Sequence, residues 1–376
     1  MYREKQVNFK NIFSFWDRFK NEEKFLFYNP KKDEILIGAK KLKVFKSGEN
    51  YDGYKYIFSV KSFFDTIKDS EWNGFDTENI AFAYYLKVTK DKQVIYYNGE
   101  NIEFNDSDWK EEFYEYTLEN TDYGKWEKLF NSCHNKILQN EAEKIVISRE
   151  VLVNISKEPN EEFLIKRLMK NNKQSFVFAY KKGEKCFLGA TPEILVEKVG
   201  TTITSHAVAG TLIKDKNHNK EDFLNDDKNS YEQNIVVSNI KNVFDKFGKD
   251  TEVSKRDLIE TKNLYHIHTV LKTNSSENII TWRDRLHPTP ALGGMPKDIA
   301  LKAIIENENH ERGLYSSPIG LIDESGDGIF VVGIRSGLLH KNKLYAYAGC
   351  GIVEKSQCEK EYLETSGKLK TILECL

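Results

Sequence analysis

The sequence lacks the features that mark secreted, membrane-spanning or zinc-stapled proteins. Its five cysteines are an odd number and form no C-x-x-C pair, so neither a disulfide framework nor a structural zinc site is expected. No run of about 18 apolar residues occurs, which excludes a transmembrane helix. The first residues show neither the apolar core nor the small-residue cleavage site of a signal peptide. We therefore expect a cytosolic globular protein.

An excess of charge of one sign is also missing. The 376 residues include 56 Lys and Arg against 58 Asp and Glu, a formal net charge of −2. Nucleic-acid binders usually concentrate positive charge, so neither nucleic acid nor membrane is an expected partner. Only 7 prolines occur, and no Pro-rich or Ser/Gly-rich linker is present. The length predicts one large domain or two closely packed ones, and a monomer is expected.

Aromatic residues are abundant, with 23 Phe and 19 Tyr, and many fall in short alternating segments that predict strands. Short Gly, Asn or Asp turns between these segments favour antiparallel pairing. Clustered hairpins followed by isolated helices indicate an α+β fold rather than a doubly wound parallel sheet. A weakly marked division of the chain is expected near residue 120, between residues 1–120 and residues 121–376. The predicted strands are 54–60, 80–88, 93–97, 144–154, 175–180, 186–196, 201–208, 329–337 and 343–348, and the predicted helices are 123–141, 159–171, 230–247, 297–309 and 358–375.

The last predicted helix carries Glu361, Glu364 and Lys368 on one face, at i, i+3 and i+7. A solvated ladder of ion pairs is the simplest explanation of such a face. However, the helix follows an apolar strand with a G-x-G turn, and Gly349 and Gly351 would let the backbone approach a ligand closely. The third glycine of a dinucleotide-binding motif would fall at Glu354, so that motif is absent.

Two further charged residues lie in apolar surroundings. Glu232 is on the apolar side of the 230–247 helix, where a buried carboxylate must be paired, protonated or bound to a metal. Taken alone, a glutamate near the helix end that reaches water is the simpler explanation. Carboxylates from two separate helices suit Mg²⁺. Arg335 lies in a strongly apolar strand and needs an anionic partner, from the protein or from a ligand. By contrast, the residues alone favour an exposed edge lysine for Lys144 and a turn glutamate for Glu193.

Two loops, 206–211 and 286–297, are rich in small residues, glycine and proline, and each could offer backbone N–H groups to an anion. The histidines are scattered, so a zinc site is not supported. The residues alone therefore predict a pocket in the C-terminal two thirds of the chain. That pocket would bind a small, multiply anionic substrate together with a divalent cation.

A series of ordered segments resembles the chorismate-utilising enzymes, and most closely the isochorismate synthases. The resemblance covers roughly residues 120–376 and implies two large, mostly antiparallel sheets packed as a layered sandwich with helices outside. It also implies chorismate as the substrate and Mg²⁺ as the cofactor. The segments are EKIVISRE, FLGATPEILV, AVAGT, NSYEQN, NLYHIH, LHPTPALGGMP, RGLYSSPIG, GDGIFVVGIRS, YAYAGCGIVEKS and EKEYLETSGKLKTIL.

The resemblance also implies a role for each matching residue. Lys144 would be the general base that activates water for attack on C2 of chorismate, and Glu193 the acid that protonates the departing C4 hydroxyl. This chemistry requires an uncharged lysine and a protonated glutamate. The implied metal carboxylates are Glu232 and Glu364, with Glu361 beside them. The implied substrate-binding residues are Ala209, Gly210, Thr211, His266, His287, Arg335, Gly349 and Lys368.

Three details favour an isochorismate synthase, an isomerase, over its relatives. Lys144 stands where anthranilate synthases usually have glutamine, which implies water as the nucleophile. Ala209 stands where aminodeoxychorismate synthases carry a nucleophilic lysine. The HPTPA segment at 287–291 favours an enzyme whose reaction ends at isochorismate. The alternatives are a salicylate synthase, which would go on to eliminate pyruvate, and a catalytically silent chorismate-binding subunit. The sequence does not specify whether the product feeds menaquinone, siderophore or salicylate synthesis.

Overall fold

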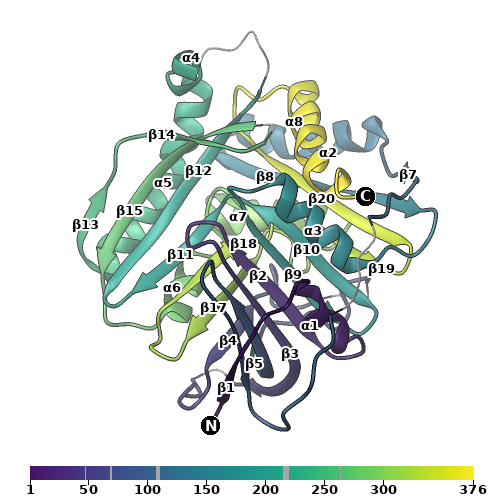
Figure 1. Cartoon of the computed structure of the whole chain (residues 1–376). Coiled ribbons are helices and arrows are strands. Elements are labelled where there is room, and N and C mark those ends of the chain that lie inside the picture. The colour runs from purple at the N-terminus through teal and green to yellow at the C-terminus, as the bar shows by residue number, and fades with distance from the viewer. Residues whose placement is uncertain (47, 68–69, 107–110, 215–219, 263) are drawn as a thin grey trace.

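The computed structural model describes residues 1–46, 48–67, 70–106, 111–214, 220–262 and 264–376. Within these ranges the chain forms eight helices and twenty strands (Figure 1). The helices are α1 (Phe13–Arg18), α2 (Tyr123–Leu138), α3 (Glu161–Asn171), α4 (Lys220–Leu224), α5 (Asp227–Phe247), α6 (Ile279–Leu286), α7 (Lys297–Asn307) and α8 (Cys358–Leu373). The strands are β1 (Arg3–Val7), β2 (Lys24–Asn29), β3 (Glu34–Phe45), β4 (Tyr56–Val60), β5 (Glu78–Val88), β6 (Gln93–Tyr97), β7 (Tyr116–Glu119), β8 (Lys144–Ile155), β9 (Phe176–Lys182), β10 (Lys185–Thr191), β11 (Ile194–Val199), β12 (Thr202–Ile213), β13 (Lys249–Val253), β14 (Asp257–Glu260), β15 (Leu264–Asn274), β16 (Gly294–Met295), β17 (Pro318–Asp323), β18 (Gly328–Val332), β19 (Ser336–His340) and β20 (Lys343–Ile352).

The strands pair antiparallel and form two layers. In the first layer the ladder runs β8, β20, β19, β10, β9, β2 and β3. In the second it runs β4, β17, β18, β11, β12 and β15. Strand β5 pairs with both β3 and β4 and so joins the layers into one hydrogen-bonded network.

Aromatic side chains fill the space between the two layers. Phe25 and Phe178 of the first layer and Phe58 of the second belong to one buried cluster. The rings of Phe25 and Phe58 stack with their centroids 4.3 Å apart. The alternating aromatic pattern of the sequence therefore marks the strand faces that look inward, because successive side chains of a strand point to opposite faces.

Helices cover the outer faces of both layers (Figure 1). Helices α1, α3 and α8 pack on the first layer, and α2 and α7 pack on β8 and β20. Helices α5 and α6 cover the second layer. The α+β layered sandwich with outer helices is thus confirmed. In the described part of the chain, no helix combines the length and apolarity needed to cross a bilayer.

Two predicted strands are wrong, because each is in fact two strands that belong to different layers. The segment 186–196 divides into β10 and β11 at Pro192, which has no N–H for a ladder. The segment 329–337 divides into β18 and β19, where Arg335 adopts a left-handed backbone with φ of 53°. The two crossovers lie side by side: the Val332 N–H donates to the Glu193 carbonyl at 3.0 Å, and the Ala190 N–H to the Arg335 carbonyl at 3.2 Å.

The N-terminal residues contribute strands to both layers. Strand β2 pairs with β9, and β4 pairs with β17, so this region is part of the same network as the rest. The division of the chain near residue 120 stays a prediction.

Candidate active site

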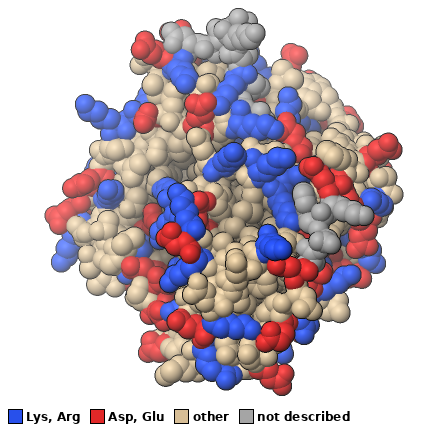
Figure 2. All heavy atoms as spheres, in the orientation of Figure 1, with Lys and Arg blue, Asp and Glu red and all other residues tan. Residues whose placement is uncertain are grey.

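A cavity lies where the two crossovers pass between the layers, with about 680 Å³ of empty space that includes its opening to solvent. In the space-filling view the surface is hollowed near its centre, and Lys and Arg side chains gather along the upper rim of that hollow (Figure 2). The cavity is lined by most of the predicted site residues and by newly found neighbours. The predicted ones are Lys144, Glu193, Ala209, Gly210, Thr211, Glu232, His266, Arg335, Gly349, Glu364 and Lys368.

Lys144 opens strand β8 and points inward with only 1% of its side chain exposed. It is therefore not a solvated edge charge. Its Nζ lies 2.8 Å from Glu232 Oε1. The neighbouring strand makes room for this pair with Gly351, since a Cβ at this position would lie 2.5 Å from both Glu232 Oε1 and Lys144 Cε.

Three glutamates come to the cavity region from two helices, Glu232 from α5 and the other two from α8, and each is paired with a lysine. Burial raises the pKa of Glu361, the neighbouring Glu364 raises it further, and Lys228 opposes both. Burial would also raise the pKa of Glu232, but Lys144 and Lys228 hold it below the usual value. The pairs are Glu232 with Lys144 at 2.8 Å, Glu361 with Lys228 at 2.5 Å and Glu364 with Lys368 at 2.6 Å.

These glutamates fit Mg²⁺ in their chemistry. They supply the carboxylate oxygens that Mg²⁺ prefers, and the pKa of Glu361 is raised by burial first and by the neighbouring Glu364 second. Among the residues that the structure describes, no three His, Cys, Asp or Glu side chains converge on one ion-sized point while the lysines are in place.

Glu193 projects from the first crossover with 7% of its surface exposed. Burial raises its pKa to about 7, although Arg335, Lys144 and Lys368 each oppose the rise. A carboxyl with this pKa holds its proton in much of the population near neutral pH. Glu193 thus has the property required of a general acid.

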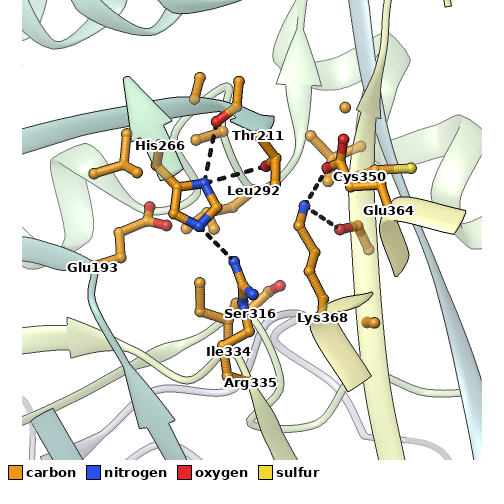
Figure 3. Close-up of a pocket in the computed structure, with 18 of the residues that line it drawn as sticks. Glu193, Thr211, His266, Leu292, Ser316, Ile334, Arg335, Cys350, Glu364 and Lys368 are labelled. Carbon is orange, nitrogen blue, oxygen red and sulfur yellow. Dashed lines mark hydrogen bonds and ion pairs between the residues drawn. The ribbon is translucent and has the colours of Figure 1, made fainter. Parts of the chain in front are cut away.

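Arg335, on the second crossover, and His266 of β15 form a hydrogen-bonded pair (Figure 3). Arg335 Nη2 lies 3.0 Å from His266 Nε2, and His266 Nδ1 lies 3.1 Å from the Gly210 carbonyl and 3.2 Å from Thr211 Oγ1. Because a guanidinium only donates, Nε2 must accept and Nδ1 must carry the proton. Burial and the nearby Arg335 hold the pKa of His266 well below its usual value, so the ring is neutral.

The guanidinium of Arg335 has no carboxylate at ion-pair distance within the described ranges, so the predicted anionic partner would have to come from a ligand. Lys368 reaches the same cavity from α8 and donates to the Gly349 carbonyl at 2.9 Å (Figure 3).

On the facing wall, the pairing of β12 with β15 shifts register between Ala209 and Thr211, and Gly210 has a φ of 72°. This bulge turns the 209–211 backbone toward the cavity.

Two predicted residues are not part of the cavity lining. Glu361 is buried behind it, paired with Lys228. His287 is 2% exposed and packs edge-on against Phe63 with ring centroids 5.4 Å apart. Its ring nitrogens have no hydrogen-bond partner among the described residues. Its predicted role in substrate binding is unsupported by this position.

Sequence reasoning gave no individual role to several lining residues. Tyr315 and Ser316 fall in the RGLYSSPIG segment that carried the family resemblance, but nothing in their type or spacing indicated a pocket. Lys228 was missed as well. It lies one helical turn before Glu232, which suggests a pair within the helix, yet it bonds instead to Glu361 of α8.

Comparison with known proteins identifies the family. The family model described as chorismate binding enzyme matches residues 84–376. The chain belongs to the chorismate-binding enzyme family. This match includes every predicted site residue and extends upstream of the region in which motifs had been found.

Curated relatives of this chorismate-binding enzyme include isochorismate synthases. It is 37% identical over 268 residues to isochorismate synthase MenF of Bacillus subtilis, covering 69% of this chain and 56% of the relative. It is 32% identical over 262 residues to the salicylate biosynthesis isochorismate synthase of Pseudomonas aeruginosa, covering 67% and 54%. The matched region thus spans little more than half the length of either relative.

A solved structure supports the fold over nearly the whole chain. The menaquinone-specific isochorismate synthase MenF of Escherichia coli superposes with a TM-score of 0.85 and covers 99% of this chain and 95% of its own. Its sequence identity is 18%, so this likeness concerns the fold. The N-terminal strands, where sequence motifs were lacking, are included in the superposition.

Proposed function

We propose that this chorismate-binding enzyme is an isochorismate synthase, a Mg²⁺-dependent isomerase that converts chorismate into isochorismate. The observation that carries the proposal is that Lys144 and Glu193 line one cavity, the first a buried amine and the second a carboxyl whose pKa is raised to about 7. An amine base and a carboxylic acid are the two groups needed to add water at one ring carbon and remove a hydroxyl at another.

In the proposed reaction Lys144 removes a proton from water as its oxygen bonds to C2. Both double bonds of the ring diene shift and the C4–O bond breaks, while Glu193 gives its proton to the departing hydroxyl, which leaves as water. In the structure Lys144 is held in an ion pair with Glu232. Base function therefore requires that the ammonium give up both this contact and its proton.

The remaining residues would bind and orient the dianionic substrate. Arg335, already directed by His266, and Lys368 provide cationic donors for its carboxylates. Glu232 and Glu364, with Glu361 behind them, would hold Mg²⁺, which would neutralise negative charge brought together by the substrate and these side chains. The bulge at 209–211 would offer backbone groups to the same substrate.

The proposal is tested with purified protein, chorismate and Mg²⁺, with products separated by chromatography. Isochorismate should form, and EDTA should abolish turnover until Mg²⁺ is restored. Salicylate and pyruvate as the main products would instead establish a salicylate synthase. If chorismate bound but was not converted at any Mg²⁺ concentration, the chain would be a binding subunit. A monomeric state stays a prediction, to be checked by light scattering.

A further inference from the structure

One edge of β8, close to Lys144, has a gap in its strand pairing. On this edge β16 pairs only with Lys144 and Ile145, and β7 begins to pair only at Leu152. Between them the Val146 carbonyl and the Ser148 N–H face the gap. Buried backbone groups of this kind need partners, which a neighbouring strand would normally supply.

The side chains of Glu308 and Arg312 supply these partners. Arg312 Nη2 donates to the Val146 carbonyl at 2.8 Å, and Glu308 Oε1 accepts from the Ser148 N–H at 2.6 Å. The two side chains bond to each other through Arg312 Nε to Glu308 Oε2 at 2.9 Å and Nη2 to Oε1 at 2.5 Å. They are 2% and 1% exposed. A buried ion pair thus takes the place of a strand.

Arg312 also holds two other walls of the cavity. Its Nη1 donates to the Leu292 carbonyl at 2.8 Å, and its own carbonyl accepts from the Tyr315 N–H at 2.7 Å. Leu292, Tyr315 and Val146 all line the cavity. One residue therefore connects the strand that carries Lys144, the 287–293 loop and the turn that follows Arg312.

Stability alone is a weak reason to keep such a pair. Buried ion pairs replaced by well-packed apolar residues often leave stability unchanged or improved, because the desolvation of two charges offsets their attraction. What apolar side chains would not reproduce is the directed contact with the Val146 carbonyl and the Ser148 N–H. The pair therefore serves to hold these backbone groups in position rather than to add stability.

We propose that Glu308 and Arg312 are positioning residues that fix the start of β8, and with it Lys144, relative to the facing cavity walls. The kinetic part of this inference rests on the proposed function. Lys144 lies on the same strand face as Val146, two residues earlier, so a shift at Val146 is passed directly to the amine. Misplacing a catalytic group by about 1 Å can lower a rate by about 10²-fold.

The test uses the double variant Glu308→Leu/Arg312→Met, which removes both charges while keeping apolar bulk, and the conservative Arg312→Lys. Arg283→Met is the matched control, since Arg283 is also buried, pairs with Asp284 at 2.9 Å and is not part of the cavity lining. Amide hydrogen exchange over 144–149, unfolding by denaturant, and kcat and KM for chorismate are measured for each.

The double variant should fold, exchange its 144–149 amides at least about tenfold faster, and lose about 30- to 100-fold in kcat with KM changed less than about threefold. Arg312→Lys should recover part of both losses. Arg283→Met should alter neither readout, whatever it costs in stability. If the double variant does not fold, the exchange of the 144–149 amides and the kcat of Arg312→Lys decide the test.

Wild-type exchange and wild-type kcat in the double variant would overturn the proposal, as would a rise in KM with kcat unchanged. If the unaltered enzyme fails to convert chorismate, the proposed function is wrong. The exchange of the 144–149 amides then decides the positioning role by itself, because it does not depend on turnover.

Discussion

The substitution Gly351→Ala tests directly whether the placement of Lys144 and Glu232 matters. The new Cβ would lie 2.5 Å from Glu232 Oε1 and from Lys144 Cε, whereas real Cβ contacts stay above 3.0 Å. Each partner must therefore move by about half an ångström or more, or the strand must shift. Gly351 does not have a positive φ, so alanine adds volume without backbone strain.

The expected result is a loss of about 10- to 100-fold in kcat, because a catalytic amine displaced by a sizeable fraction of an ångström loses its alignment with the attacking water. Overpacking should also lower the free energy of unfolding by about 1–3 kcal/mol. The assay is chorismate conversion at saturating Mg²⁺ and substrate, together with denaturant unfolding of the same preparations.

Gly337→Ala is the matched control. Its Cβ would lie 2.7 Å from Leu344 Cδ1 and 3.0 Å from the Tyr345 carbonyl, a comparable clash in a strand that is outside the cavity lining. It should lose stability but keep its kcat. The reasoning is refuted if Gly351→Ala retains more than about a third of the wild-type kcat, or if both variants lose kcat in proportion to stability.

Four further outcomes are expected. Lys144→Ala should lower kcat by about 10²–10⁴-fold with chorismate binding largely kept, and more than a tenth of wild-type activity would remove the base assignment. Since Glu193 must be protonated, kcat/KM should fall about tenfold per pH unit above about 7, and Glu193→Gln should lose that limb. The raised pKa also means that wild type, relative to Glu193→Gln, should lose about 3 kcal/mol of unfolding free energy between pH 4.5 and 8, as denaturant titrations would show. Glu364→Ala should weaken Mg²⁺ and chorismate binding together, measured by calorimetry.

Much of the fold was predictable because its signals are local. Alternating aromatic and apolar residues mark β5, β6, β8, β9 and β20, and the 3.6-residue period marks α2, α3, α5, α7 and α8. Glu232 was correctly placed on the apolar side of its helix, but the sequence alone favoured a helix-end glutamate that reaches water, and the side chain is in fact buried. Such patterns depend on a single element packing one face against the core, so one element's sequence is enough to reveal them.

What could not be predicted depends on contacts between distant segments. Nothing in the sequence around Lys228 shows that it bonds to Glu361, which is 133 positions away. Lys144 was indistinguishable from an edge lysine until β20 and α5 were in place around it. Of the three lysine–glutamate pairs, Glu364 with Lys368 lies within α8, whereas the other two join elements that are far apart in the sequence. Residue type and spacing within one element therefore left several alternatives open.

The two wrong strands point to the origin of the site. An uninterrupted strand keeps its backbone groups in one ladder and its side chains alternating between two faces. At Pro192–Glu193 and at Gly333–Arg335 the chain leaves one layer for the other, and the two crossovers bond to each other between the β10–β19 and β11–β18 ladders. The side chains of Glu193 and Arg335 are thereby released from the strand faces and turned into the space between the layers. The break in each predicted strand, which made the strand prediction wrong, is therefore also the feature that brings the Glu193 carboxyl and the Arg335 guanidinium to the cavity. A substitution that straightens either crossover, for example replacement of Pro192 with a β-branched residue, should therefore lower the activity of the site more than the stability of the core.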